Sequence, residues 1–112
     1  MLLFASCGQQ HNAESIVKEF MRQNLNDASQ LNDIEFADID STKYINESMV
    51  KNIREAANRS PQYKHGIIYN ATSVVGRQLI IARVHYKIGE KKFRDTYYLD
   101  ENVTAVVAFK NN

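Results

Sequence analysis

Apolar positions near the start of the chain recur in steps of three and four, which is the spacing of one face of a helix. They are Ile16, Val17, Phe20, Met21 and Leu25. Asn12 is a residue type that caps helix N-termini, and Glu14 follows where the helix end is positive. The asparagine and aspartate side chains after residue 23 compete for backbone hydrogen bonds. The pattern therefore predicts a helix over residues 12–25.

Two shorter patterns follow. Ile34 and Phe36 alternate with Glu35, which indicates a strand or extended segment over residues 33–39. Helical spacing then returns at Met49, Val50, Ile53, Ala56 and Ala57. Asn46 and Ser41 are the candidate N-caps of this second helix, and Pro61 should end it because the residue before a proline avoids the helical conformation.

After Pro61 the apolar period changes to two, which is typical of strands. The clearest strand runs from about residue 78 to residue 88 and turns at Gly89-Glu90. One of its faces carries Ile80, Ala82, Val84, Tyr86 and Ile88, and the other carries Leu79, Ile81, Arg83, His85 and Lys87. A return strand to Leu99 and a last strand ending near Phe109 complete a meander. An earlier strand over residues 67–75, ended by Gly76, would be the fourth.

This order predicts an α+β domain over residues 13–112, with two N-terminal helices packed on one face of a four-stranded antiparallel meander sheet. The order resembles the cystatin-like group of folds, which includes the ketosteroid-isomerase-like relatives. The resemblance implies a scaffold and no activity, since enzymes, inhibitors and binding modules share it.

Composition narrows the class of protein. Of 112 residues, 44% are hydrophobic and 24% charged, as in soluble globular domains. Fourteen Lys and Arg against thirteen Asp and Glu leave a charge of +1, too little for the field on which non-specific nucleic-acid binding depends. The single cysteine excludes an internal disulfide, and the three histidines are scattered. We therefore expect no nucleic-acid partner, no metal and no cofactor.

Cys7 is the residue with the clearest functional signal. It follows a short apolar run, and Phe4-Ala5-Ser6-Cys7 resembles the bacterial lipobox, departing from it in having Phe4 where Leu, Val or Ile is usual. The resemblance implies a lipid on Cys7, with residues 1–6 the remnant of a signal peptide and residues 7–12 a polar tether. The alternative is a cytosolic domain with a frayed apolar start and an inert thiol.

Three longer stretches strengthen the first interpretation. LFASCG, LNDIEFADIDSTKYI and YYLDENVTAVVAF resemble small uncharacterised lipoproteins of Bacteroidetes. That resemblance implies an exported protein, anchored to a membrane through Cys7, facing the periplasm or the cell surface, with an envelope protein as a candidate partner. Asp40-Ser41-Thr42 also fits the O-glycosylation pattern of such organisms at Ser41, although these residue types favour a helix cap.

Asp95 is the candidate catalytic acid. Strand parity places it on the core face with Tyr97, and Tyr86 of the preceding strand shares that face. A carboxylate in an apolar pocket has a raised pKa and serves as the general base of ketosteroid isomerases. The preferred alternative is that Asp95 accepts a hydrogen bond from a tyrosine hydroxyl, pairs with an arginine or lies near an edge of the sheet.

Charged side chains gather in two further places. A basic cluster surrounds the hairpin tip at Lys87, Lys91, Lys92 and Arg94. It would attract an anionic partner or lipid headgroups, although protection of an exposed strand from foreign pairing is the preferred explanation. An acidic cluster over residues 33–40 lacks the ligand order of a calcium loop and predicts a solvated edge.

Three hypotheses of function follow. The leading one is a lipid-anchored, non-catalytic binding or interaction module of the cell envelope. The second is a small-molecule-binding or isomerase-like enzyme domain with a pocket around Tyr86, Asp95 and Tyr97. The third is a cytosolic interaction domain.

Overall fold

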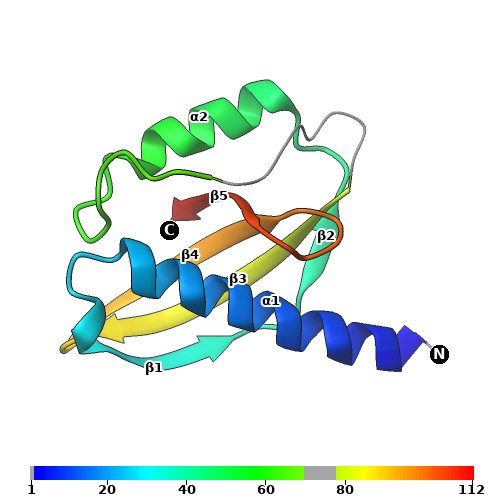
Figure 1. The fold of residues 1–112 in the computed structure, drawn as a ribbon, viewed down its shortest axis with the longest axis horizontal. Helices are drawn as coiled ribbons and strands as arrows, with labels where there is room; N and C mark the ends of the chain where they lie inside the picture. The colour runs from blue at the N-terminus through cyan, green and yellow to red at the C-terminus, as the bar shows by residue number, and fades with distance from the viewer. Residues whose placement is uncertain (1, 70–77) are drawn as a thin grey trace.

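Two α-helices and five strands form the part of the chain that the computed structural model describes, residues 2–69 and 78–112, with side chains from residue 8 onward (Figure 1). In chain order they are α1 (Leu2–Asn24), the short 3-10 helix η1 (Ala28–Gln30), β1 (Leu31–Phe36), β2 (Asp40–Thr42), α2 (Glu47–Ala57), β3 (Leu79–Ile88), β4 (Lys91–Leu99) and β5 (Val106–Asn111). The α+β class is therefore confirmed.

The strands form one antiparallel sheet in the order β1-β3-β4-β5, and β2 also pairs with β3. β1 lies along the end of β3 and β2 along its beginning, so together they make one outer edge. The β3-β4-β5 meander is as predicted, with Gly89 at the first turn in a left-handed conformation (φ 61°). The sheet has five strands rather than four, because β1 overlaps the segment expected as a strand or extended stretch over residues 33–39 and β2 follows it.

The predicted strand over residues 67–75 falls mostly outside the described residues. Its described part, residues 67–69, is not a strand. The sequence signal there was a run of apolar and β-branched residues, and apolar runs do not by themselves distinguish a strand from a packed loop.

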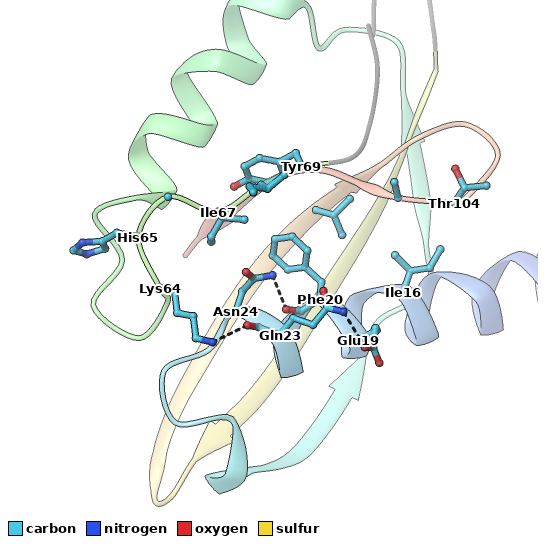
Figure 2. A pocket seen from close by; sticks show the side chains of 14 residues that line it. Ile16, Glu19, Phe20, Gln23, Asn24, Lys64, His65, Ile67, Tyr69 and Thr104 are labelled. Atoms are coloured by element: carbon cyan, nitrogen blue, oxygen red, sulfur yellow. Dashed lines mark hydrogen bonds between the residues drawn. The ribbon is translucent and has the colours of Figure 1, made fainter.

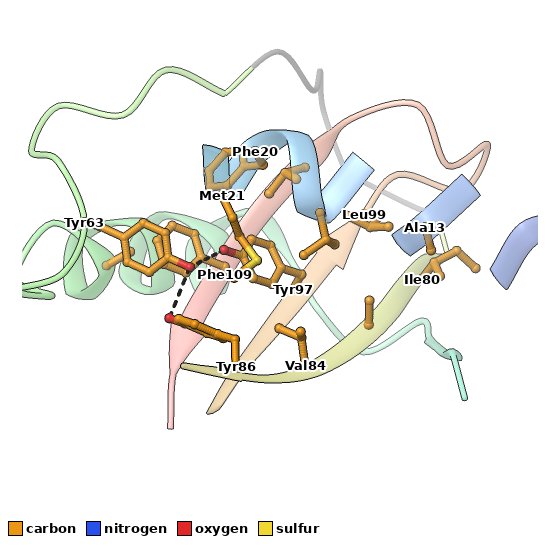
Figure 3. Close-up of a cluster of buried hydrophobic side chains, with 14 of the residues drawn as sticks. Ala13, Phe20, Met21, Tyr63, Ile80, Val84, Tyr86, Tyr97, Leu99 and Phe109 are labelled. Carbon is orange, nitrogen blue, oxygen red and sulfur yellow. Dashed lines mark hydrogen bonds between the residues drawn. The ribbon is translucent and has the colours of Figure 1, made fainter. Parts of the chain in front are cut away.

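The two helices pack on opposite faces of the sheet, which corrects the prediction that both cover one face. On the first face, α1 buries Val17 and Met21 in a cluster with Tyr97 and Phe109 (Figure 3). On the second face, Val50 of α2 packs in a separate cluster with Leu79, Ile81, Tyr98, Val107 and Ala108. The reason is visible at the start of β3, where residues 79–82 are all apolar and all buried. That end of the sheet needs cover on both sides.

α1 begins at Leu2, ten residues before the predicted start, so Asn12 is not its N-cap. Residues 8–12, predicted as a tether, continue the helix. Gln10 fixes this part to the connection between β1 and β2, because its amide donates to the Ala37 carbonyl (3.1 Å) and accepts from the Ile39 N–H (2.8 Å). Such long-range contacts leave no periodic trace in the sequence.

α2 begins after Asn46, whose side-chain oxygen accepts a hydrogen bond from the Met49 N–H (2.8 Å). The helix ends at Ala57, before Pro61, as predicted. Ser41 is not a helix cap, because its backbone lies in β2 opposite Ile80 of β3. The preferred explanation of Asp40-Ser41-Thr42 as a cap was therefore wrong.

Asn46→Ala is expected to lower the free energy of unfolding by about 1 kcal/mol, since it removes the acceptor for an otherwise unsatisfied N–H at the helix start. Urea unfolding followed by circular dichroism measures this loss. The matched control is Asn52→Ala, an exposed position inside α2, which should raise stability slightly because alanine is the better helix former. Equal losses in the two variants would contradict the capping role.

Candidate functional site

Asp95 of β4 is almost completely buried, with 1% of its surface exposed, on the face covered by α1. Its Oδ2 accepts hydrogen bonds from the hydroxyls of Tyr63 and Tyr86, both at 2.6 Å. Its Oδ1 accepts from the Asn111 amide, also at 2.6 Å. The preferred prediction for Asp95, a hydrogen bond from a tyrosine hydroxyl, is therefore confirmed.

Strand register accounts for most of this cluster. Val84 of β3 lies opposite Asp95, so Tyr86, two residues later, is its diagonal neighbour on the same face. Asn111 of β5 lies directly opposite Asp95 on the other side. The three residues predicted for a pocket, Tyr86, Asp95 and Tyr97, are thus brought together.

Besides Asn111, Tyr63 is the residue bonded to Asp95 that lies outside the predicted pocket. It lies in the connection after α2, where a bridge to Leu25 holds the chain against the end of α1. Hydrogen bonds from the Lys64 N–H to the Asn24 carbonyl (2.8 Å) and from the Asn26 N–H to the Gln62 carbonyl (2.9 Å) strengthen that contact. The connection has no apolar periodicity. The only sequence signal for Tyr63 was the Gln62-Tyr63 pair directly after Pro61.

The hydrogen bonds of the cluster are all oriented toward Asp95. The Tyr63 hydroxyl donates its one hydrogen bond to Asp95. Tyr97 is therefore the donor in the short hydrogen bond between the Tyr97 and Tyr63 hydroxyls. Gln62 Nε2 donates to the Tyr86 hydroxyl at 3.4 Å. Gln62 Oε1 is buried, and no described residue donates to it. Every donor in this cluster therefore points toward the carboxylate.

Burial governs the acidity of these groups. It raises the pKa of Asp95 above its ordinary value, although hydrogen bonds from Tyr63, Tyr86 and Asn111 oppose the shift. Burial is also the largest cause that raises the pKa of each of the three tyrosines. The hydroxyls therefore stay protonated and keep donating at physiological pH.

The space around this cluster is filled by side chains. The Phe109 ring stacks on Tyr97 with centroids 5.1 Å apart and lies 4.4 Å from Tyr63. Phe20 of α1 packs edge-on against Tyr97 at 5.6 Å, and Figure 3 shows Met21 among the same rings. Tyr97 is fully buried and Tyr86 is 2% exposed. In this conformation Asp95 belongs to the packed core and has no route to solvent through these neighbours.

Two of the surface hollows in the described part of the chain contain chemistry-bearing side chains. The first, of about 550 Å³, lies between α1 and the segment at residues 64–69 (Figure 2). Phe20 and Tyr69 stack in its wall at 5.9 Å, and the Arg54 guanidinium lies 4.4 Å from the Tyr69 ring. Burial raises the pKa of Tyr69 to about 12, against the opposing charge of Arg54. The contact between Phe20 and Tyr69 is thus covered by the Arg54 cation, and the side chains of Glu19, Lys64 and His65 also line the hollow.

The second hollow, of about 680 Å³, is lined by side chains of β3 and β4 that face away from α1 and also by Tyr86 and Phe93, which lie on the α1 side. Its lining residues are Asp33, Glu35, His85, Tyr86, Lys87, Lys92, Phe93, Arg94 and Asn112. This places three members of the predicted basic cluster together. The protective explanation fails for Lys87 and Arg94, which lie where β3 and β4 are bonded on both sides. Lys91 and Lys92 lie before the residues of β4 that pair with β5.

The remaining candidates are separate from both places. Ser41 is exposed on β2, and its N–H donates to Asp40 Oδ1 at 2.8 Å. Cys7 lies in α1, before the residues whose side chains are described. No group of three or more potential metal ligands occurs in the described part of the chain, and no helix described there has the length and apolar character to cross a membrane.

Comparison with protein-family models, with curated proteins and with solved structures found no match to this chain.

Proposed function

We propose that this chain is a lipid-anchored, non-catalytic binding module of the cell envelope, held to a membrane through Cys7. The observation that carries the proposal is the place of Cys7, in the lipobox-like sequence and at the end of α1 that projects past the sheet (Figure 1). Gln10 is the nearest following residue with a described bond to the sheet side, and a Cβ on Gly8 would meet open space. A lipid on Cys7 is thus compatible with an intact core.

The buried carboxylate supports binding rather than catalysis. Both oxygens of Asp95 are occupied by hydrogen-bond donors, and its surroundings are packed rings. An isomerase-like reaction would require Tyr63 to leave Asp95 before any substrate reached it. The cystatin-like scaffold stays part of the proposal, supported by one long helix lying across an antiparallel sheet.

Metabolic labelling tests the anchor. In the native host, the wild-type chain is expected to incorporate an alkyne palmitate analogue and to sediment with membranes. Cys7→Ala should abolish the label and release the protein, because the thiol is the attachment point. Ser6→Ala is the matched control, since a small residue remains before the cysteine, and it should be labelled like the wild type. Unlabelled wild-type protein in the soluble fraction would instead favour the cytosolic interaction domain.

A further inference from the structure

The side of the sheet opposite α1 is only partly covered. α2 packs on its end near Leu79, Ile81 and Tyr98, and beyond that end the outward side chains are mostly charged. We call this surface the basic face; its cations are Arg83, Lys87, Lys92, Arg94 and Lys110, with His85 among them. Three adjacent strands contribute to it, so it is a surface rather than a hairpin tip.

Cations of the basic face lie close to one another. Lys87 lies directly opposite Lys92, and Arg94 follows two residues later on the same face of β4. Like charges at such cross-strand positions destabilise a sheet. Asp33 compensates Lys87 at 3.2 Å, whereas no described residue forms an ion pair with Lys92 or Arg94.

Edge protection does not account for the whole of this arrangement. Arg94 lies where β4 is bonded on both sides, because it pairs with His85 of β3 and its carbonyl accepts from the Asn112 N–H (2.8 Å), so its charge excludes no foreign strand. Lys92 lies just before the residues of β4 that pair with β5. A bound anion would relieve the repulsion, and the arginine guanidinium offers a two-pronged donor for a carboxylate or phosphate. The uncompensated cations therefore indicate an anionic ligand.

The hollow beside these cations shows which kind of anion fits. Its walls carry the carboxylates of Asp33 and Glu35 as well as the cations Lys92 and Arg94, and the partly buried ring of Phe93. Carboxylates accept hydrogen bonds from hydroxyl groups and repel other carboxylates. A ligand with both hydroxyl and negative groups can donate hydrogen bonds to the carboxylates and pair with the cations. The side-chain carboxylates of an acidic peptide would be repelled by Glu35.

We propose that the basic face binds an acidic oligosaccharide, a glycan whose sugar units carry carboxylate groups. Lys92 and Arg94 would bind the carboxylates, and Glu35 would accept from sugar hydroxyls. The orientation rests on the proposed function: the hairpin between β3 and β4 lies at the opposite end of the molecule from the N-terminus of α1 (Figure 1), so an anchor at Cys7 points the basic face away from the bilayer. This favours a glycan over the headgroups of the anchoring membrane.

Binding to oligogalacturonate, a uronic-acid oligomer, tests the inference. The full chain carrying Cys7→Ser is titrated calorimetrically at low ionic strength. The double variant Lys92→Gln/Arg94→Gln should bind about tenfold more weakly, because two exposed charge pairs are lost. Lys51→Gln/Arg59→Gln, which removes the same two residue types from exposed positions in and after α2, should bind like the parent chain. Equal affinity of the two double variants would overturn the proposal.

Three further arms identify the ligand class. Methyl-esterified oligogalacturonate, which lacks the charge, should not bind. Glu35→Gln keeps an acceptor for sugar hydroxyls and removes a negative charge, so it should strengthen binding to polyglutamate more than binding to oligogalacturonate. Tighter binding of the parent chain to polyglutamate, or to phosphatidylglycerol vesicles, than to oligogalacturonate would overturn the proposal in favour of an acidic protein or a membrane. Palmitate labelling of Cys7 is measured independently of glycan binding. One proposal can therefore fail while the other stands.

Discussion

Replacing Phe109 with alanine is expected to lower the free energy of unfolding by about 3–5 kcal/mol, the usual loss for a fully buried aromatic ring. Phe109 has no exposed surface, and it is surrounded by Tyr63, Tyr97 and Phe20 with ring centroids 4.4, 5.1 and 5.5 Å away. These rings come from the loop after α2, from β4 and from α1, so one substitution loosens three elements. Because a domain is stabilised by only about 5–15 kcal/mol, the loss is a large share of the total.

Phe93→Ala is the matched control for this prediction. Phe93 lies on the same face of the sheet but is only partly buried and stacks on one ring, that of Tyr86, at 5.5 Å. Its loss should therefore be less than half that of Phe109→Ala. Urea unfolding with tyrosine fluorescence and circular dichroism measures both, and a comparable loss in the two variants would show that Phe109 is not central to the core.

The parts of the fold that were predictable from sequence are those fixed by neighbours along the chain. The alternation in residues 79–88 and 91–99 identified β3 and β4, and Gly89 identified their turn. Parity alone placed Asp95, Tyr86 and Tyr97 on one buried face, because side chains in a strand alternate strictly. The cap at Asn46 was recognisable for the same local reason.

The errors concern contacts between distant segments. No local pattern shows that Gln10 bonds to residues 37 and 39 and that α1 therefore extends through residues 8–12, or that Tyr63 reaches Asp95 from a loop. The strand order is likewise non-local, and it shows that Arg94 lies on a paired part of the sheet rather than at a free edge. α2 covers the second face of the sheet because the first four residues of β3 are all apolar and all buried. A rule based on alternation alone does not predict this.

Asp95→Leu is expected to lower the free energy of unfolding by about 2–6 kcal/mol at neutral pH. The substitution leaves the buried hydroxyls of Tyr63 and Tyr86 without their acceptor, and each unsatisfied buried polar group costs about 1–3 kcal/mol. Asp38→Leu, which removes an exposed aspartate, should change stability by less than about 0.5 kcal/mol. Equal unfolding midpoints in urea for the two variants would show that the cluster contributes nothing.

Asp95→Asn should behave in the opposite way. Its amide oxygen still accepts from Tyr63 and Tyr86, and the exposed amide of Asn111 is free to rotate and accept from the new NH₂ group. The buried charge is removed while the hydrogen bonds are kept. Stability at neutral pH should therefore equal or exceed that of the wild type.

The pH dependence separates charge from hydrogen bonding. Burial raises the folded-state pKa of Asp95 above its ordinary value of 3.8, so its contribution to stability is complete below about 3.8 and is lost as pH rises through the raised value. The advantage of Asp95→Asn over the wild type should consequently be largest at neutral pH and shrink on acidification through that window.

Asp100 titrates with the opposite sign in the same experiment. Burial would raise its pKa, but hydrogen bonds from Thr104 and Ala105 outweigh burial and lower it, so its contribution is lost as pH falls through the lowered value. That loss is common to both chains and cancels in their difference. A stability difference between Asp95→Asn and wild type that stays constant from neutral pH to below 3.8 would therefore show that the Asp95 carboxyl is not buried as a charge in the folded protein.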